Sequence, residues 1–334
     1  MITIKDVARE AGVSIATVSR VLNSPEKVSE MTRKNVLKVV HKTGFKLSPS
    51  PRKQGWFKTV GLIAPNLMGN FYGEIAMGIE KVLFDHRFDL LVAMARDIQK
   101  REKQIIEEYF QRKVDGLLVC TMLTEEHILD RLIDSGIPVV AVDHRVGDIK
   151  ADSVNIDNVS AAFSVAKFLY ERGHRKVLCI PGQDYVYSSL DRIKGLQFFA
   201  QAHKDITFHF TRIRGFEPQY GYDALHAYLK HNPLDFSAIF GFNDHICMGV
   251  FSALKELGVS VPGQVSVMGF DDSVFAPYTV PGLTTVSQPR VEMGRLAAEL
   301  LLERLSRKGP KIFRNVLLPT QIVERESVGF VGGK

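Results

Sequence analysis

The first 22 residues constrain the fold most strongly, because they predict two short helices joined by a glycine turn. Apolar residues at three- and four-residue steps form one face of the first helix: Ile4, Val7, Ala8 and Ala11. Gly12 tolerates the left-handed conformation that a tight turn needs, and Ser14 can cap the second helix. The inward face of the second helix is expected to contain Val18, Val21 and Leu22. The segment therefore predicts a helical hairpin that is packed on one side only.

Positive charge is concentrated in the same part of the chain. Residues 1–59 contain twelve Lys and Arg against four Asp and Glu, whereas the whole chain contains 43 against 37. A third helix is expected after the cap Ser29, with an apolar side formed by Val36, Leu37, Val39 and Val40 and a basic side formed by Arg33, Lys34, Lys38 and Lys42. An ordinary hairpin with a solvated polar face does not need this basic excess. A segment that neutralises DNA phosphates does need such an excess of positive charge.

The outer face of the second helix is the expected base-reading surface, because a helix-turn-helix docks this helix in the major groove. The planar guanidinium of Arg20 matches the O6 and N7 acceptors of guanine. Hydroxyls such as those of Thr17 and Ser19 suit phosphate or water-mediated contacts, and Ile15 or Ala16 suits a thymine methyl. The predicted DNA-contacting residues of this region are Thr3, Ser14, Ile15, Ala16, Thr17, Ser19, Arg20 and Asn23.

From Val60 onward, short apolar runs alternate with longer amphipathic stretches. The runs cover residues 60–64, 116–120, 138–142, 176–180 and 237–240. Continuous apolar runs are typical of strands covered on both faces, so we expect parallel sheets with helices on each side. No run approaches the roughly 20 apolar residues of a membrane span. The chain begins directly in the hairpin with no secretory leader, so we expect no membrane partner and a cytoplasmic location.

No residue pattern indicates catalysis, a metal site or a cofactor. The three cysteines, Cys120, Cys179 and Cys247, lie far apart beside apolar runs and are expected to be buried, reduced thiols. The histidines are scattered, with no spacing typical of a catalytic triad or a metal site. We therefore expect a binding protein and not an enzyme. The main alternative is a ligand-binding protein of transport or chemotaxis, but such a protein would need an export signal and no basic headpiece.

Several motifs resemble those of one family, the LacI/GalR family of bacterial transcriptional regulators. The N-terminal match comprises residues 3–23, Lys27-Val28-Ser29 and Thr32-Arg33. It continues in family order through Asp157-Asn158, Gly173-His174-Arg175, Phe242-Asn243-Asp244, Gly258-Val259-Ser260-Val261-Pro262, Gly269-Phe270-Asp271-Asp272, Leu283-Thr284-Thr285-Val286 and Arg325-Glu326-Ser327. The resemblance covers nearly the whole chain.

The resemblance implies an α/β fold in three parts. These are a three-helix helix-turn-helix headpiece (1–47), a hinge or linker (48–59), and an effector-binding and dimerisation domain (60–334) like the periplasmic sugar-binding proteins. That domain would have two doubly wound lobes of parallel sheets joined by three crossings, the first about 60–159 and 289–318 and the second about 160–288 and 319–334. The implied function is a regulator, expected to be a repressor, that binds palindromic double-stranded operator DNA as a homodimer. A small molecule between the lobes would control it allosterically.

Effector-binding candidates lie just after the apolar runs, because ligands of such sheets bind beyond the carboxyl ends of the strands. They are Asn66, Asn70, Phe71, Tyr72, Asp143, Arg145, Tyr187, Ser188, Arg192, Phe216, Asn243, Asp271 and Gln288. The resemblance implies that Arg192, Asn243 and Asp271 hold the effector and that Phe216 and Phe71 or Tyr72 stack on it. In the alternative interpretation Asn243 only caps the next helix and Asp271 only orders its own turn. Arg192 is expected to open a helix, where the helix dipole disfavours a cation without a polar partner.

The identity of the effector stays open. Aromatic rings together with a carboxylate and planar donor groups that bind in a bidentate way suit a sugar or sugar derivative. A sugar or sugar derivative is therefore our first expectation. Phe216 and Tyr72 would also permit a purine sandwich, and residues 215–222 are similar to those of family members controlled by a purine. Against a nucleobase, Val186 stands where an additional arginine is expected. A phosphoprotein co-regulator is a further alternative, and the sequence does not distinguish induction from co-repression.

The linker departs from the family pattern, which has an Ala-Arg-x-Leu motif whose leucine enters the minor groove. Here Gln54 replaces the leucine, and Pro49, Pro51 and Gly55 leave little room for a stable helix. One hypothesis is that Trp56 or Phe57 acts as the wedge instead. The other is an irregular linker in which Arg52, Lys53 and Lys58 follow phosphates. Arg52, Gln54 and Trp56 complete the predicted DNA-contacting residues, and the tail lacks the leucine heptads of a tetramer-forming coiled coil.

Overall fold

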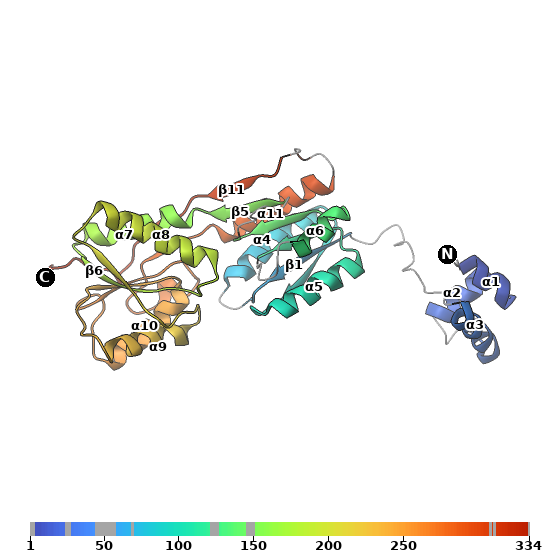
Figure 1. Ribbon diagram of the computed structural model, residues 1–334, viewed down its shortest axis with the longest axis horizontal. Coiled ribbons are helices and arrows are strands. Elements are labelled where there is room, and N and C mark those ends of the chain that lie inside the picture. Colours follow the sequence, from blue (N-terminus) through green and yellow to red (C-terminus); the bar gives the residue numbers. More distant parts are fainter. Residues whose placement is uncertain are drawn as a thin grey trace. The chain divides into compact units, whose positions relative to one another are not determined.

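A computed structural model describes residues 4–23, 28–43, 58–67, 70–120, 127–144, 151–306, 309 and 312–332. The chain divides into two compact units, Met1–Trp56 and Phe57–Lys334. The first unit is helical and the second combines helices with parallel sheets (Figure 1).

The N-terminal unit is a three-helix bundle made of α1 (Ile4–Ala11), α2 (Ile15–Asn23) and α3 (Glu30–Thr43). Gly12 has φ 64° in the turn between α1 and α2, as its position predicted. Ser14 caps α2, since its Oγ accepts a hydrogen bond of 3.0 Å from the amide of Thr17. The predicted inward positions form the core with little exposure: Val7, Ala8, Ala11, Val18, Val21, Val36 and Val39.

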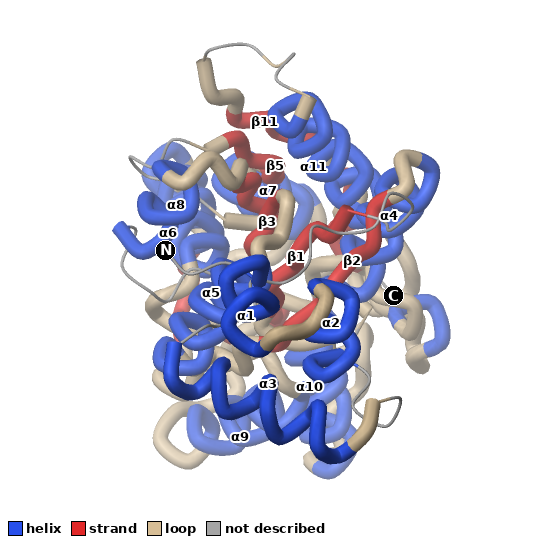
Figure 2. Tube along the Cα trace, turned by 90° about the vertical axis from the view of Figure 1, so that its right-hand side faces the viewer, coloured by secondary structure: helices blue, strands red, loops and turns tan. Residues whose placement is uncertain are grey.

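The first lobe of the larger unit is built on a six-stranded parallel sheet in the order β11-β5-β4-β3-β1-β2. Figure 2 shows β1 and β2 side by side in this sheet. The strands are β1 (Lys58–Ala64), β2 (Phe88–Met94), β3 (Gly116–Val119), β4 (Val139–Val142), β5 (Asp152–Ile156) and β11 (Asn315–Leu318). The helices are α4 (Phe71–Asp85), α5 (Gln99–Arg112), α6 (His127–Asp134) and α11 (Arg290–Leu305).

Both faces of this sheet are covered, which explains the continuous apolar runs of β1, β3 and β4. Leu62 packs in the cluster that contains Ile75 and Ile79 of α4, whereas its neighbour Ile63 packs in a separate cluster with Ile105 of α5. Successive side chains of a strand point to opposite faces, so α4 and α5 lie on opposite sides of the sheet.

Helices α4 and α11 approach each other closely through two glycines. A Cβ atom on Gly78 of α4 would collide with the carbonyl oxygen of Val291, and one on Gly294 of α11 would collide with the carbonyl oxygen of Ile75. Neither position has room for a side chain, so the close backbone contact depends on glycine.

The second lobe contains a four-stranded parallel sheet in the order β7-β6-β8-β9 and a small antiparallel pair, β10-β12. Its strands are β6 (Lys176–Ile180), β7 (Thr207–Phe210), β8 (Ala238–Gly241), β9 (Ser266–Met268), β10 (Thr285–Ser287) and β12 (Gln321–Val323). Its helices are α7 (Asn158–Glu171), α8 (Tyr187–Ala202), α9 (Pro218–Leu229), α10 (Asp244–Glu256) and the short 3-10 helix η2 (Ala276–Tyr278).

The chain passes between the lobes three times, after β5, after β10 and after β11. The predicted fold class, a three-helix headpiece with a two-lobed α/β unit of parallel sheets, is confirmed. The three cysteines are buried free thiols, as predicted. Among the described helices none is long and apolar enough to cross a membrane.

Candidate functional site

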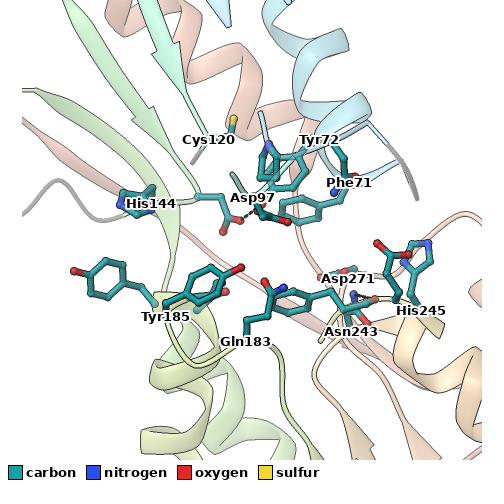
Figure 3. A pocket seen from close by; sticks show the side chains of 18 of the residues that line it. Phe71, Tyr72, Asp97, Cys120, His144, Gln183, Tyr185, Asn243, His245 and Asp271 are labelled. Carbon is teal, nitrogen blue, oxygen red and sulfur yellow. Dashed lines mark hydrogen bonds between the residues drawn. The ribbon is translucent and has the colours of Figure 1, made fainter. Parts of the chain in front are cut away.

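A cavity of about 390 Å³ lies between the two lobes, at the carboxyl ends of their parallel strands. Figure 3 shows Tyr72, Asp97 and His144 on one wall and Tyr185, Asn243 and Asp271 on the other. The volume lies in the range of small-molecule sites, roughly 300–1,000 Å³.

Most of the predicted effector-binding residues line this cavity: Asn66, Phe71, Tyr72, Asp143, Tyr187, Ser188, Arg192, Phe216, Asn243, Asp271 and Gln288. Asn70 does not. It is exposed, has φ 66°, and precedes α4 without a side-chain cap bond. Arg145 lies outside the described residues. Phe71 and Tyr72 form the first turn of α4 and therefore do not lie in a loop, the surroundings their sequence suggested.

Other lining residues were missed by the sequence analysis: Pro65, Arg96, Asp97, Cys120, His144, Gln183, Tyr185, Glu217, Tyr220 and His245. Val186, which the sequence analysis considered as a position of the pocket, lines it as well. Arg96 and Asp97 follow β2, a half-exposed edge strand that was not among the apolar runs considered. Gln183 and Tyr185 follow β6 closely, so the strand-end rule contained a signal for them.

Arg192 is the buried cation of the cavity, with only 4% of its surface exposed. Its Nη1 donates to the carbonyl oxygen of Phe242, and its Nε donates to Asn158 Oδ1 over 2.9 Å. The guanidinium carbon lies 3.5 Å from the centre of the Phe270 ring. The expectation that Arg192 opens a helix is wrong, because α8 begins at Tyr187 and places Arg192 in its second turn. Its partners, and not the helix terminus, explain why a cation is tolerated there.

Asp143 faces the cavity from the first lobe. Burial raises the pKa of its carboxyl to about 6, against the lowering effects of Arg192 and of a hydrogen bond from Tyr72. The Tyr72 hydroxyl donates to Asp143 Oδ2 over 3.5 Å. The positive charge of Arg192 in the second lobe therefore lowers the pKa of Asp143 in the first lobe.

Asp271 is the corresponding carboxyl of the second lobe. Burial raises its pKa to about 7, while Arg192 opposes the rise and Asp244 adds to it. Its Oδ1 accepts a hydrogen bond of 2.7 Å from Gln288 Nε2, and its backbone has φ 116°, a strained conformation for a side-chain-bearing residue.

Asn243 caps a helix and also lines the cavity, and its contact with an effector stays a prediction. Its Oδ1 accepts from the amide of Ile246 over 2.8 Å and so caps α10, while its side chain also lines the cavity. Its Nδ2 donates to the carbonyl oxygen of Phe216 over 3.0 Å. The side-chain amide therefore fixes the backbone that carries the Phe216 ring.

Arg290 joins the two lobes beside the cavity, a role that the sequence analysis did not predict. Its Nε donates to Glu74 Oε2 of α4 over 2.8 Å, and its Nη2 donates to the carbonyl oxygen of Asp272 over 3.0 Å. The contact spans 216 positions in the sequence, so no local pattern reveals it.

In the N-terminal unit the predicted DNA-facing side of α2 is accessible. Ile15, Ala16 and Arg20 are exposed, and Thr17 is half-buried with its Oγ1 2.8 Å from Ser14 Oγ. Two lysines of α3 are engaged with carboxylates: Lys34 Nζ lies 2.9 Å from Glu30, and Lys42 Nζ lies 2.9 Å from Glu10.

The remaining predicted DNA-contacting positions are not described. Thr3, Arg52, Gln54 and Trp56 lie outside the described residues, as do the side chains of Ser19 and Asn23. Both linker hypotheses remain predictions.

Comparison with known proteins places the chain among regulators. The profile of bacterial regulatory proteins of the lacI family matches residues 3–48, and that of a periplasmic binding protein-like domain matches residues 166–328. The HTH-type transcriptional repressor PurR of Vibrio atlanticus is 33% identical over 336 residues, which cover 98% of this chain and 99% of the relative. The chain belongs to the LacI family.

Solved structures of the family have the same fold. A complex of the transcriptional regulator CelR with cellobiose is 27% identical with a TM-score of 0.73, and the match covers 98% of this chain and all of that one. A periplasmic binding protein/LacI transcriptional regulator of Alkaliphilus metalliredigens, complexed with D-xylulofuranose, is 28% identical with a TM-score of 0.73. That match covers 81% of this chain and 99% of the other.

Membership of the LacI family makes the chain a DNA-binding transcriptional repressor and not an enzyme, as predicted. The lacI-family match covers α1, α2 and α3 of the N-terminal unit, and the role of α2 in reading the bases stays a prediction.

Proposed function

We propose that this LacI-family repressor binds an inverted-repeat operator as a homodimer and that a small polyhydroxylated molecule in the interlobe cavity sets its affinity for DNA. In this arrangement residues 1–47 are the headpiece, 48–59 the linker and 60–334 the regulatory domain. A single headpiece reads one half-site, so useful affinity requires two headpieces at a fixed spacing.

The composition of the cavity walls is the observation that carries the effector proposal. Aromatic rings of Tyr72 and Phe216 come from opposite lobes, and the carboxyls of Asp143 and Asp271 flank Arg192 between them. Rings stack on the apolar face of a sugar, while carboxylates accept hydrogen bonds from its hydroxyls. The cellobiose and D-xylulofuranose complexes of structural neighbours support the same ligand class.

A nucleobase is the second candidate. Tyr72 and Phe216 offer flat rings from opposite walls, an arrangement that also suits a planar heterocycle. A ligand of either class that contacts both lobes favours one relative position of the lobes and thereby shifts the conformational equilibrium.

Exposed apolar side chains support dimerisation through the regulatory domain. Tyr278 and Val280 of the second lobe are 83% and 95% exposed, and Met77 and Phe84 of α4 are 61% and 66% exposed. A second copy of the chain would cover apolar side chains of this size, which are costly to expose to water. Val280→Asp should therefore shift the protein toward monomer in light scattering and weaken operator binding.

Selection of bound DNA from a random pool tests the proposal directly. The experiment uses the full chain, with and without panels of sugars and nucleobases. An inverted repeat whose recovery changes with one panel member supports it. Enrichment of unrelated single sites contradicts the dimer, and recovery that no panel member changes contradicts small-molecule control.

A further inference from the structure

Most of the hydrogen-bond donors deep in the cavity are already used by the protein. Gln288 Nε2 donates to Asp271, Asn243 Nδ2 donates to Phe216, and the Tyr72 hydroxyl donates to Asp143. Arg192 uses Nε and Nη1 on Asn158 and Phe242. A ligand therefore meets more free acceptors than free donors on these residues.

One of these acceptors is buried and unsatisfied. Gln288 is 3% exposed and lines the cavity, and its Oε1 has no hydrogen-bond partner among the described residues. A buried acceptor without a partner costs free energy, so a donor supplied by a ligand is favoured there.

Two further carboxylates face the cavity from opposite lobes. Asp97 lies in the turn after β2, and Glu217 precedes α9 without a side-chain cap bond. Neither makes a hydrogen bond or an ion pair through its side chain within the described parts of the chain. Burial raises the pKa of Asp97, and the charge of Glu217 on the opposite wall adds to the rise.

The cations of the cavity do not balance these groups. Its carboxyls are Asp97, Asp143, Glu217 and Asp271, whereas its guanidiniums are Arg96 and Arg192. Burial lowers the pKa of both cavity histidines, to about 4 for His144, which leaves them neutral near pH 7. Arg192 already donates hydrogen bonds to Asn158 and to the carbonyl oxygen of Phe242. Arg96 forms no ion pair with a described residue.

We propose that the effector carries an ammonium group, as in an amino sugar or an aminopolyol, and that this group binds between Asp97 and Glu217 while a ligand hydroxyl donates to Gln288 Oε1. An ammonium has three hydrogen-bond donors and a positive charge but no acceptor, and the side chains of Asp97 and Glu217 have neither a donor nor a cation as partner within the described residues. It also replaces a like-charge repulsion between the lobes by two attractions and so favours their approach. This inference rests on the proposed small-molecule control of the cavity.

Calorimetric titration of the full chain with matched ligands tests the charge preference. The probes are hexoses of gluco, galacto and manno configuration, each as the parent sugar, the 2-amino-2-deoxy sugar, its N-acetyl form and the 6-phosphate, at about pH 6.5 where an amine is protonated. In at least one configuration the amine should bind about tenfold or more tightly than the parent and the N-acetyl form, and the phosphate should bind weakest.

Isosteric variants assign the preference to the two carboxylates. Asp97→Asn and Glu217→Gln should each reduce the amine-over-parent ratio, whereas Glu108→Gln on the exposed face of α5 should leave it unchanged. Two separate variants keep the test valid if one of them does not fold. No amine preference in any configuration, or a preference that both variants retain, overturns the inference.

The outcomes separate this inference from the proposed function. If neutral sugars or nucleobases bind and change operator affinity while amines gain nothing, the ammonium inference is wrong and the proposed function stands. If none of these compounds binds and none changes operator affinity, both are wrong.

Discussion

Gly182 lies against the tip of the Phe216 ring, and a Cβ atom at this position would collide with the Cζ and Cε1 atoms of the ring. Gly182 follows β6, and Phe216 precedes α9, so the contact sets how far the ring reaches into the cavity. The absence of a side chain at Gly182 therefore leaves the space that the Phe216 ring occupies beside the cavity.

Gly182→Ala should displace the Phe216 ring toward the cavity and weaken effector binding by about tenfold, with a smaller effect on stability because a ring can move where backbone cannot. Calorimetry with the strongest ligand of the panels measures the loss, and operator binding by the ligand-free protein is the control. Unchanged ligand affinity would show that the ring does not contact the effector.

Arg192→Met should destabilise the regulatory domain, and the loss should grow with pH. Arg192 lowers the pKa of both Asp143 and Asp271, so without it these buried carboxyls ionise less readily. The penalty is small at low pH, where they are protonated, and reaches about 3 kcal/mol or more where they must ionise without a partner. Thermal unfolding from about pH 5 to about pH 8 measures it. A constant difference between variant and wild type would contradict the pairing.

Local patterns predicted the headpiece well because its core is periodic. Val7, Val18 and Val36 occupy the inward faces that three- and four-residue spacing assigns to them, and the caps precede their helices as expected. Strand ends predicted much of the cavity for a similar reason, since continuous apolar runs locate β1, β4 and β6.

The errors have physical causes. The start of α8 was placed too late, because its N-cap residue Val186 makes no side-chain cap bond and gives no capping signal before Tyr187. Asp97 was missed because β2 is an edge strand with partly exposed side chains.

Contacts between distant segments had no sequence signal at all. The bond from Gln288 to Asp271 spans 17 positions and that from Arg290 to Glu74 spans 216. The first contact exists because a β-bridge sets Asp271 beside Ser287 within the second lobe, and the second exists because the chain crosses back to place α11 against α4.

Asp271→Asn should stabilise the protein increasingly as the pH rises. Folding raises the pKa of Asp271 from 3.8 to about 7. The contribution of Asp271 to stability is therefore complete below the unfolded-state pKa of 3.8 and is lost as the pH rises to the folded-state pKa of about 7. The difference in the free energy of unfolding between variant and wild type should therefore change up to about pH 7 and then level off.

Asp235→Asn is the matched control for this pH dependence. A hydrogen bond from Lys176 lowers the pKa of Asp235, so its contribution is lost only at acid pH and stays constant from about pH 5 to about pH 8. Parallel curves for Asp271→Asn and wild type over this range would disprove the raised pKa.

Gly294→Ala should destabilise the regulatory domain by about 1–3 kcal/mol, because its methyl group would meet the backbone of α4 and the helices cannot separate without losing packing. Gly73→Ala is the control within α4. Apart from its chain neighbours and the backbone of its own helix, no described atom lies within 4 Å of the position of its Cβ, so the better helix propensity of alanine should raise stability by up to about 1 kcal/mol. Chemical denaturation measures both. Equal effects at the two positions would mean that the close α4–α11 contact does not limit stability.

Arg20→Ala should remove sequence recognition while leaving the headpiece folded, because the side chain is exposed on α2 and makes no ion pair with a described residue. The loss at the contacted base pair should be about 1–3 kcal/mol, and Arg20→Lys should recover little of it because lysine lacks the planar fork that matches guanine. Lys34→Ala is the control, since Lys34 pairs with Glu30 and should leave the sequence preference unchanged. Binding to the selected operator and to point-substituted operators at physiological salt measures the preference. If Arg20→Ala discriminates among these operators as the wild type does, α2 does not read the bases through this residue.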